Sequence, residues 1–339
     1  MTPNRPPHTI QQEDMVMSGC RCYRVVAGLS LLATLILLTA AAPPPGQVPP
    51  AADPAKDAVL DGHVFHDAGR VLLHVTNWGL IGSWPGTTAS FAWSPSARWP
   101  DMGGDDYLWA AGLWVGALQD GTPRVTTGQF EREYLPTSAP EDTIYSAGMG
   151  LPGGARYPDT DPDDDGDGLE DEDPPNGRDD DGDGLVDEDF GGIADQGFRC
   201  EYRDDDPRIL EQSPDHVPLN LQVVQRSFQW SDPGNDAFVG FDFTIRNVGD
   251  EALEAVYVGF FADCDIHPAD VVGGAEDDMA GSYRGPATAS DGTVVPVSLA
   301  YMYDRAPNPL PGYIGVLFLD HTTDPSGATA PPGAELSSM

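Results

Sequence analysis

Apolar and polar residues alternate along several short stretches of this chain, which is the pattern of half-buried β-strands. The clearest stretch is 237–247, AFVGFDFTIRN, where apolar residues occupy every second position from Val239 to Ile245. A second stretch, 254–265, repeats the alternation directly after a polar turn at 247–250. The short connection predicts that the two strands pair with each other as a β-hairpin.

Further stretches of the same kind occur on both sides of this pair. Apolar runs at 63–66, 70–78 and 107–118 precede it, and 297–304 and 313–320 follow it. No long stretch beyond the N-terminal apolar run shows helical periodicity, while 39 glycines and 33 prolines supply frequent turns. We therefore expect an all-β fold, an antiparallel β-sandwich of Ig-like or jelly-roll-like type, interrupted by an acidic insertion.

The same pattern divides the chain into six segments. These are a leader (1–42), a Pro/Ala-rich linker (43–57), an N-terminal β region (58–135), a loop-rich insertion (136–198), a C-terminal β-sandwich region (199–325) and a flexible or truncated tail (326–339). The sequence leaves open whether the two β regions form one sandwich. If the chain is truncated at its tail, further β-domains are expected to follow.

The leader has the order of a secretory signal peptide. Basic residues precede the apolar run 25–42, which ends in the small residues Ala40-Ala41-Ala42 before a proline cluster. Cleavage there predicts a mature chain that begins near Pro43, has no membrane span, and is secreted or held at the cell surface. An uncleaved membrane anchor is the alternative, although a run of this length is at the short end for a span.

Composition and charge narrow the class of partner. Hydrophobic residues make up 40% of the chain, which is typical of a folded protein, and the formal net charge is −38. Because nucleic acids and anionic lipids are bound through cationic patches, this charge argues against both as partners. The acidity is concentrated in 159–190, which contains 17 Asp and Glu residues and one basic residue, Arg178.

Two acidic repeats account for this concentration. DDDGDGLEDED occupies 163–173, and DDDGDGLVDED occupies 179–189. Calcium takes six to eight oxygens, and a short loop supplies them when carboxylates recur at alternate positions around a glycine. The predicted calcium ligands are Asp163, Asp165, Asp167 and Asp171 in the first loop, and Asp179, Asp181, Asp183 and Asp187 in the second. A solvated acidic linker without metal is the alternative, but it has no need of regularly placed glycines.

These repeats resemble the calcium loops of thrombospondin type 3 repeats, and 176–189 is similar to acidic repeats of large secreted bacterial proteins. The resemblance covers only the two repeats and implies calcium as the cofactor. It departs from the helix–loop–helix calcium hand, since Pro174 and Phe190 stand where that motif has a glutamate at position 12. A second frame would start at Asp161 and place Glu172 at position 12. Its equivalent in the second repeat starts at Gly177, so the first frame is preferred.

Removal of the leader would leave two cysteines, Cys200 and Cys264. Disulfides persist outside the cell, so we expect a bridge between them. It would close a loop of about 65 residues and stabilise the fold by roughly 4 kcal/mol. Two buried free thiols are the alternative.

Two other groups of polar residues are weaker candidates for chemistry. Asp263, Asp265 and His267 alternate along the end of a strand and would suit a metal-assisted hydrolase, but they also fit an ordinary polar strand end. Three histidines would suit zinc, although their spacing on a strand places the first two on opposite faces. They are His63, His66 and His74.

Six of the seven tryptophans lie in one short part of the chain, from Trp78 to Trp114. Aromatic rings of this kind form platforms for sugars, but they also fill β-sheet cores, and we expect Trp109 and Trp114 to lie in the core. The chain has no G-x-S-x-G, H-E-x-x-H or phosphate-binding loop motif, so no catalytic residue is assigned. The sequence favours a non-enzymatic, calcium-binding structural or adhesive protein whose partner is a surface glycan or a protein. The alternative is a secreted carbohydrate-binding module or carbohydrate-active hydrolase.

Overall fold

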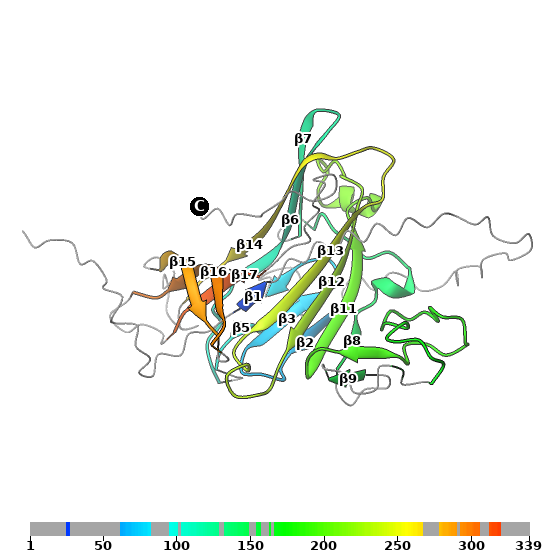
Figure 1. Cartoon of the computed structure of the whole chain (residues 1–339). Coiled ribbons are helices and arrows are strands. Elements are labelled where there is room, and N and C mark those ends of the chain that lie inside the picture. The colour runs from blue at the N-terminus through cyan, green and yellow to red at the C-terminus, as the bar shows by residue number, and fades with distance from the viewer. Residues whose placement is uncertain are drawn as a thin grey trace, which may run out of the picture.

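The computed structural model describes most of the chain between Gly62 and Leu319, together with one short strand near the N-terminus (Figure 1). The described residues are 25–27, 62–82, 95–100, 103–128, 132–148, 154–156, 163, 166–266, 278–289, 292–305 and 312–319. Within them the chain forms β-strands and two short 3₁₀-helices, η2 (Pro140–Asp142) and η3 (Pro207–Glu211), and no α-helix. The predicted all-β class is confirmed. No helix among these residues has the length and apolar character needed to cross a membrane.

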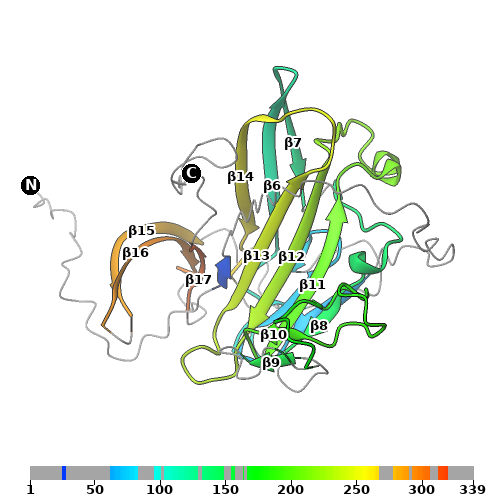
Figure 2. The same cartoon turned by 45° about the vertical axis from the view of Figure 1, so that its right-hand side comes forward.

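The larger of two main sheets has eight strands. In order across the sheet they are β15 (Met279–Thr288), β16 (Val294–Tyr303), β17 (Ile314–Phe318), β1 (Val25–Ala27), β13 (Val239–Asn247), β12 (Leu221–Gln229), β11 (Gln196–Arg203) and β8 (Tyr145–Ala147). Neighbouring strands are antiparallel, except that β1 runs parallel to both β13 and β17. Figure 2 shows β15 and β16 standing to one side of the other strands.

The second sheet has seven strands and is antiparallel throughout. Its strands are β14 (Glu254–Asp263), β6 (Ala110–Gln119), β4 (Ile81–Gly82), β3 (Leu72–Thr76) and β2 (His63–His66), with β5 (Ser96–Arg98) paired to β3 and β7 (Thr122–Thr127) paired to β6. A separate parallel pair, β9 (Gly154–Arg156) and β10 (Phe190–Gly192), lies beside the acidic loops.

The two main sheets share one hydrophobic core, and in both views β2 and β3 lie behind β11–β13 (Figures 1 and 2). Leu113 of β6 is fully buried against the same cluster as Phe241 and Phe243 of β13. The ring of Phe260, from β14, lies with its centroid 6.2 Å from that of Phe243 and bridges the layers. Burying one such aromatic side chain stabilises the fold by about 2 to 3 kcal/mol. Side chains of both main sheets therefore belong to one core.

The predicted hairpin between 237–247 and 254–265 is wrong, although both strands form. β13 pairs with β12 and β1, whereas β14 pairs with β6 in the other sheet. The alternating pattern remains correct, since Phe241 and Phe243 are buried. Packing across the core buries the apolar face of β13 and partly buries that of β14, although the two strands are not paired with each other.

The pairing of β6 with β14 places strands of both predicted β regions in one sheet. The N-terminal region 58–135 and the C-terminal region 199–325 thus share a sheet and a core, which the sequence had left open. The predicted linker and tail lie outside the described residues, as does the leader apart from Val25–Ala27. The segment boundaries and the sandwich type stay predictions.

Cys200 and Cys264 are free thiols, so the bridge predicted between them is not formed in this structure. Cys200 lies on β11 of the larger sheet, and its Sγ donates to the carbonyl oxygen of Thr76 at 3.8 Å. Cys264 follows β14 of the other sheet and packs against the common core. Burial raises the pKa of both thiols, that of Cys264 to about 12, so each is held in its neutral form.

Candidate metal centre

The two acidic repeats form consecutive tight loops that end at β10 (Figure 1). The glycine at position 6 has a positive φ in both loops, +96° at Gly168 and +102° at Gly184. L-residues rarely adopt this conformation, whereas glycine does so without strain. The glycine spacing in the sequence thus corresponds to a turn that the backbone makes twice.

Aspartate side chains hold each loop in this conformation. The carboxylate at position 1 accepts the N–H of the glycine at position 6 at 3.1 Å, and the carboxylate at position 5 accepts the N–H of the following leucine at 2.7 Å. The four pairs are Asp163–Gly168, Asp179–Gly184, Asp167–Leu169 and Asp183–Leu185. The same bonds recur at equivalent positions of both repeats, so the two loops have equivalent local structures.

The loops are joined to each other through Asp173. Its backbone N–H donates to the carbonyl oxygen of Asp189 at 3.1 Å. Its carboxylate, from the first loop, accepts the N–H groups of Asp180 and Asp187 in the second loop at 3.2 and 3.1 Å. Because Asp173 is almost fully buried, these bonds are shielded from water. The first loop therefore anchors the second.

Carboxylates of both loops converge on Asp181. Three groups have ligand oxygens that lie within 4.8 Å of one another, close enough to share an ion. The groups are Asp167, Glu172 and Asp181; Asp173, Asp181 and Glu188; and Asp179, Asp181 and Asp183. Two of the three groups combine residues of both loops. The structure therefore confirms acidic clusters that can hold a metal ion.

The structure brings together only part of the predicted ligand set. Asp179, Asp181 and Asp183 form one group within the second loop, as their spacing predicts, while Asp167 joins Asp181 across the loops. Asp163, Asp171 and Asp187 belong to none of the three groups. Asp165 lies outside the described residues.

The two aspartates at position 9 have other roles. Asp187 braces its loop, since its Oδ1 accepts the backbone N–H groups of Asn176 and Gly177 at 2.6 and 2.8 Å. Asp171 instead lines a pocket that lies between the first loop and the face of β11 and β12. Both residues have positive φ angles, +50° for Asp171 and +59° for Asp187, so the backbone turns at the same position in each loop.

Two glutamates take part that the preferred frame did not include. Glu172 and Glu188 occupy the same place in the two repeats, and no hydrogen-bond donor of the described residues reaches any of their four carboxylate oxygens, which are shielded from solvent. Desolvation and neighbouring carboxylates raise the pKa of each glutamate to about 7. Both occupy position 12 of the frame that was set aside because Gly177 offers no ligand at its start, so their common spacing was the available signal.

The chemistry of these groups restricts the type of ion. All ligand atoms are carboxylate oxygens, and no histidine or cysteine enters a group among the described residues. Oxygen-only sites suit hard cations such as calcium and magnesium. A divalent cation would offset the desolvation and the carboxylate repulsion that together raise the pKa values of Glu172 and Glu188.

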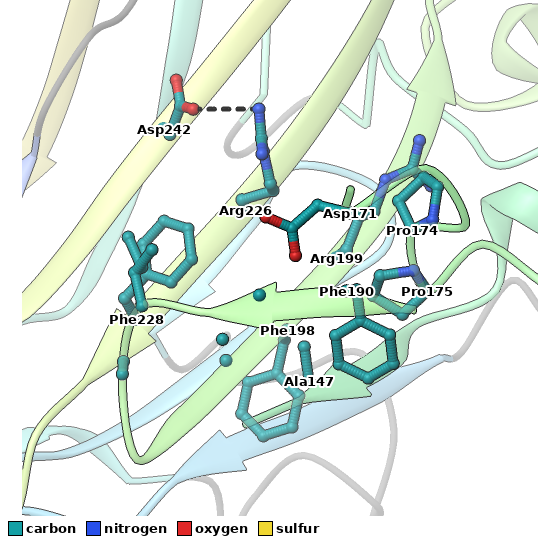
Figure 3. A pocket seen from close by; sticks show the side chains of 15 residues that line it. Ala147, Asp171, Pro174, Pro175, Phe190, Phe198, Arg199, Arg226, Phe228 and Asp242 are labelled. Carbon is teal, nitrogen blue, oxygen red and sulfur yellow. Dashed lines mark ion pairs between the residues drawn. The ribbon is translucent and has the colours of Figure 1, made fainter. Parts of the chain in front are cut away.

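A pocket of about 330 Å³ lies between the first loop and the face of β11 and β12 (Figure 3). Phe190, Phe198 and Phe228 supply apolar walls, and Asp171 projects toward it from the loop. Arg226, at its margin, forms an ion pair of 3.3 Å with Asp242. The first acidic loop thus forms part of the pocket wall.

The three histidines do not converge on a common point. The rings of His63 and His74 lie with centroids 5.2 Å apart, whereas His66 is buried on the core side and bonds through Nε2 to Ser227 Oγ at 2.7 Å. Burial lowers the pKa of His66 to about 3 and that of His74 to about 4. Their places in the fold give the zinc hypothesis no support.

The acidic row at the end of β14 is only partly described. Asp263 is the last residue of β14 and Asp265 follows, but His267 lies outside the described residues. Partial burial, together with the charge of Asp265, raises the pKa of Asp263. The hydrolase hypothesis stays a prediction.

The tryptophans divide between core and surface. Trp78 and Trp99 are buried, whereas 38% of Trp109 is exposed and Trp114 lies partly exposed on the outer face of β6. The expectation that Trp109 and Trp114 fill the core is therefore wrong. The alternation of β6 explains the second case, because its inward positions are taken by smaller residues such as Leu113 and Val115. Trp84 and Trp93 lie outside the described residues.

Comparison of the chain with protein-family models, with curated proteins and with solved structures finds no match. The features of the site that bear on function are the carboxylates around Asp181 and the bonds that join the two loops.

Proposed function

We propose that this chain is a secreted or cell-surface calcium-binding protein of structural or adhesive function, in which bound calcium orders two acidic loops carried by a β-sandwich. The observation that carries the proposal is the state of Glu172 and Glu188. Their oxygens lie close to those of Asp181 and its neighbours, are shielded from solvent, and receive no hydrogen-bond donor from the described residues. Buried carboxylates in this situation require a cation or a proton.

Calcium fits these groups better than magnesium does. Magnesium demands a near-ideal octahedron and keeps most of its waters, whereas calcium accepts six to eight oxygens in irregular arrangements. The three groups around Asp181 share that residue and lie among further carboxylates of both loops, which suits an ion that accepts many oxygens. We expect an affinity on the order of 10⁻⁴–10⁻³ M, as in other extracellular calcium modules.

A structural role follows from the position of the ions. An ion held by Asp167, Glu172 and Asp181 would link the two loops, and the bond between Asp173 and Asp189 already brings them together. Without the ion, repulsion among these carboxylates favours opening of both loops. Calcium would therefore hold the two loops of the insertion together, and no catalytic step is assigned to it.

Calorimetric titration of the full chain with calcium chloride tests this proposal. We expect saturable binding and a rise in melting temperature. At about 10 mM calcium and a Kd near 10⁻⁴ M, each site would stabilise the fold by about 2.7 kcal/mol. Asp181→Asn should abolish most of the heat, and Asp250→Asn, an exposed aspartate in the turn before β14, should not. Absence of saturable heat, or an equal response to magnesium, would overturn the assignment to calcium.

A further inference from the structure

The outer face of β6 and β14 carries aromatic residues that lie opposite glycines. Residues facing the core from these strands include Val115 and Val258, so the alternate positions point outward. In the register of the pair, Trp114 lies opposite Gly259, and Tyr257 lies opposite Gly116. Trp114 and Tyr257 therefore each have a glycine, with no side chain, at the position directly opposite on the other strand.

Together these side chains form a surface that we call the aromatic platform, made of Trp114, Tyr257 and Phe261. Phe261 stacks on Trp114 with ring centroids 5.0 Å apart and an interplanar angle of 5°. Tyr257 is 76% exposed, and Val125 of β7, which pairs with Gly116, is 51% exposed. From Tyr257 to Phe261 the platform extends about 13 Å along β14.

Neither packing nor backbone conformation requires the two glycines. A Cβ added at Gly259 would meet no described atom within 4 Å, and one at Gly116 would have its nearest neighbour at an ordinary 3.7 Å. Neither residue has a positive φ. Gly112, opposite Phe261, is different, because a Cβ there would lie 2.8 Å from the backbone of Gly128.

Glycine inside a strand weakens the strand, and it often marks a place where a ligand approaches the backbone closely. Gly116 and Gly259 leave a flat floor of backbone between projecting rings. This arrangement suits a ligand with flat, weakly polar faces that can lie on the floor and against the rings.

Charge selects among such ligands. Glu254 and Asp263, at the two ends of β14, lie opposite Leu118 and Ala110, which share the face of β6 that carries Trp114, and the chain as a whole is strongly acidic. Anionic polymers are therefore repelled. Carboxylates accept hydrogen bonds from hydroxyl groups, while aromatic rings pack against the C–H faces of sugars.

We propose that the aromatic platform binds a neutral polysaccharide, with pyranose rings lying on Gly116 and Gly259 beside Tyr257 and Trp114. The carboxylates of Glu254 and Asp263 accept hydrogen bonds from its hydroxyl groups. In both views β6, β7 and β14 lie away from β9 and β10, which adjoin the acidic loops (Figures 1 and 2). The site is therefore separate from the candidate metal centre.

Affinity electrophoresis of the full chain in gels containing β-glucan, glucomannan or soluble chitin derivatives tests the proposal, with pull-down on microcrystalline cellulose as a second readout. We expect retardation by at least one neutral polysaccharide and none by anionic polygalacturonate. Tyr257→Ala should weaken binding about tenfold. Val294→Ala, which truncates an exposed apolar side chain on β16, is the matched control and should bind normally.

Gly259→Val separates binding from folding. The new side chain has free space in the fold but would stand on the floor of the platform, so binding should be lost while the melting temperature is unchanged or higher. Binding should also persist in EDTA, which distinguishes it from the calcium proposal. Retention of binding by Gly259→Val would overturn the proposal. Failure to bind any neutral polysaccharide, with self-association that depends on Tyr257, would show instead that the platform is an interface between copies.

Discussion

The backbone N–H of Asp173 donates a 3.1 Å hydrogen bond to the carbonyl oxygen of Asp189, and this bond joins the two acidic loops. The two residues are the last of DDDGDGLEDED and DDDGDGLVDED, so the bond connects equivalent positions of the repeats. Since Asp181, from the second loop, belongs to all three carboxylate groups, the first loop is not expected to bind an ion independently of the second.

Damage to the second loop should therefore weaken binding at the first. Gly184→Val forces a branched residue into a φ of +102° and should open the second loop. We expect calorimetry to show loss of more than half of the bound calcium. Gly121→Val is the matched control, because Gly121 also has a positive φ and open space around it but lies in the turn between β6 and β7. Retention of one full-affinity site in Gly184→Val would argue for independent loops.

The two glutamates should contribute more to calcium affinity than the aspartates at position 9. We expect Glu172→Gln and Glu188→Gln each to weaken calcium binding about tenfold, since each removes a charged ligand whose oxygens have no other donor. In EDTA the same variants should melt at a higher temperature, because they reduce carboxylate repulsion. Asp171→Asn should change affinity by less than about twofold, as Asp171 lies in none of the groups. A larger loss of affinity in Asp171→Asn than in the two glutamate variants would instead support the ligand set that starts at Asp163.

The contrast between these residues shows which features of the site can be predicted from the spacing of residues in the sequence. The alternation of aspartate and glycine predicts the conformation of each loop, because the bonds from Asp179 and Asp183 connect residues that are close in the chain. The role of Glu172 depends on Asp181, which belongs to the other loop. A contact between two loops leaves no mark in the spacing of either one, so the shared centre could not be predicted.

The same holds for the strands: the existence of a strand can be predicted from its own residues, but its pairing partner cannot. Burial imposes a period of two on Phe241 and Phe243 whatever their neighbours are, so β13 was predictable from its own residues. The partner of β14 was not. β14 pairs with β6, while its Phe260 packs near Phe243 of β13 across the core, and the short connecting turn had indicated pairing with β13 instead.

Two buried histidines should make the fold sensitive to acid. Burial depresses the pKa of His66 to about 3 and that of His74 to about 4, the latter also beside His63, while both titrate near 6.5 when unfolded. Below pH 6.5 the unfolded chain binds protons that the folded chain does not, so stability falls as pH falls toward the folded pKa values. At pH 5 each histidine should cost about 2 kcal/mol relative to pH 8.

Urea denaturation of wild type and His66→Gln at pH 5 and pH 8, in saturating calcium, measures this effect. The variant is expected to be less stable than wild type at pH 8, since the contact with Ser227 Oγ is disturbed. Its loss of stability between pH 8 and pH 5 should be smaller by about 2 kcal/mol. An unchanged difference between the two pH values would mean that His66 does not titrate on unfolding.

Export should remove the leader. The basic, apolar and small-residue order of 21–42 predicts that secreted material begins between Ala41 and Gly46. N-terminal sequencing of protein from the medium or cell surface measures this directly. A chain that retains 25–38 would identify the apolar run as an anchor.

The position of β1 bears on the order in which these events can occur. Val25–Ala27 lies in the predicted leader, yet it is a strand of the larger sheet, parallel to Gly240–Phe241 of β13 and to Val316–Phe318 of β17. A leader that has entered a folded sheet is no longer available to a translocation channel, so folding competes with export for the same short strand. If the chain is exported as we propose, export would depend on slow closure of this sheet, and a variant that folds faster should accumulate inside the cell as unprocessed precursor.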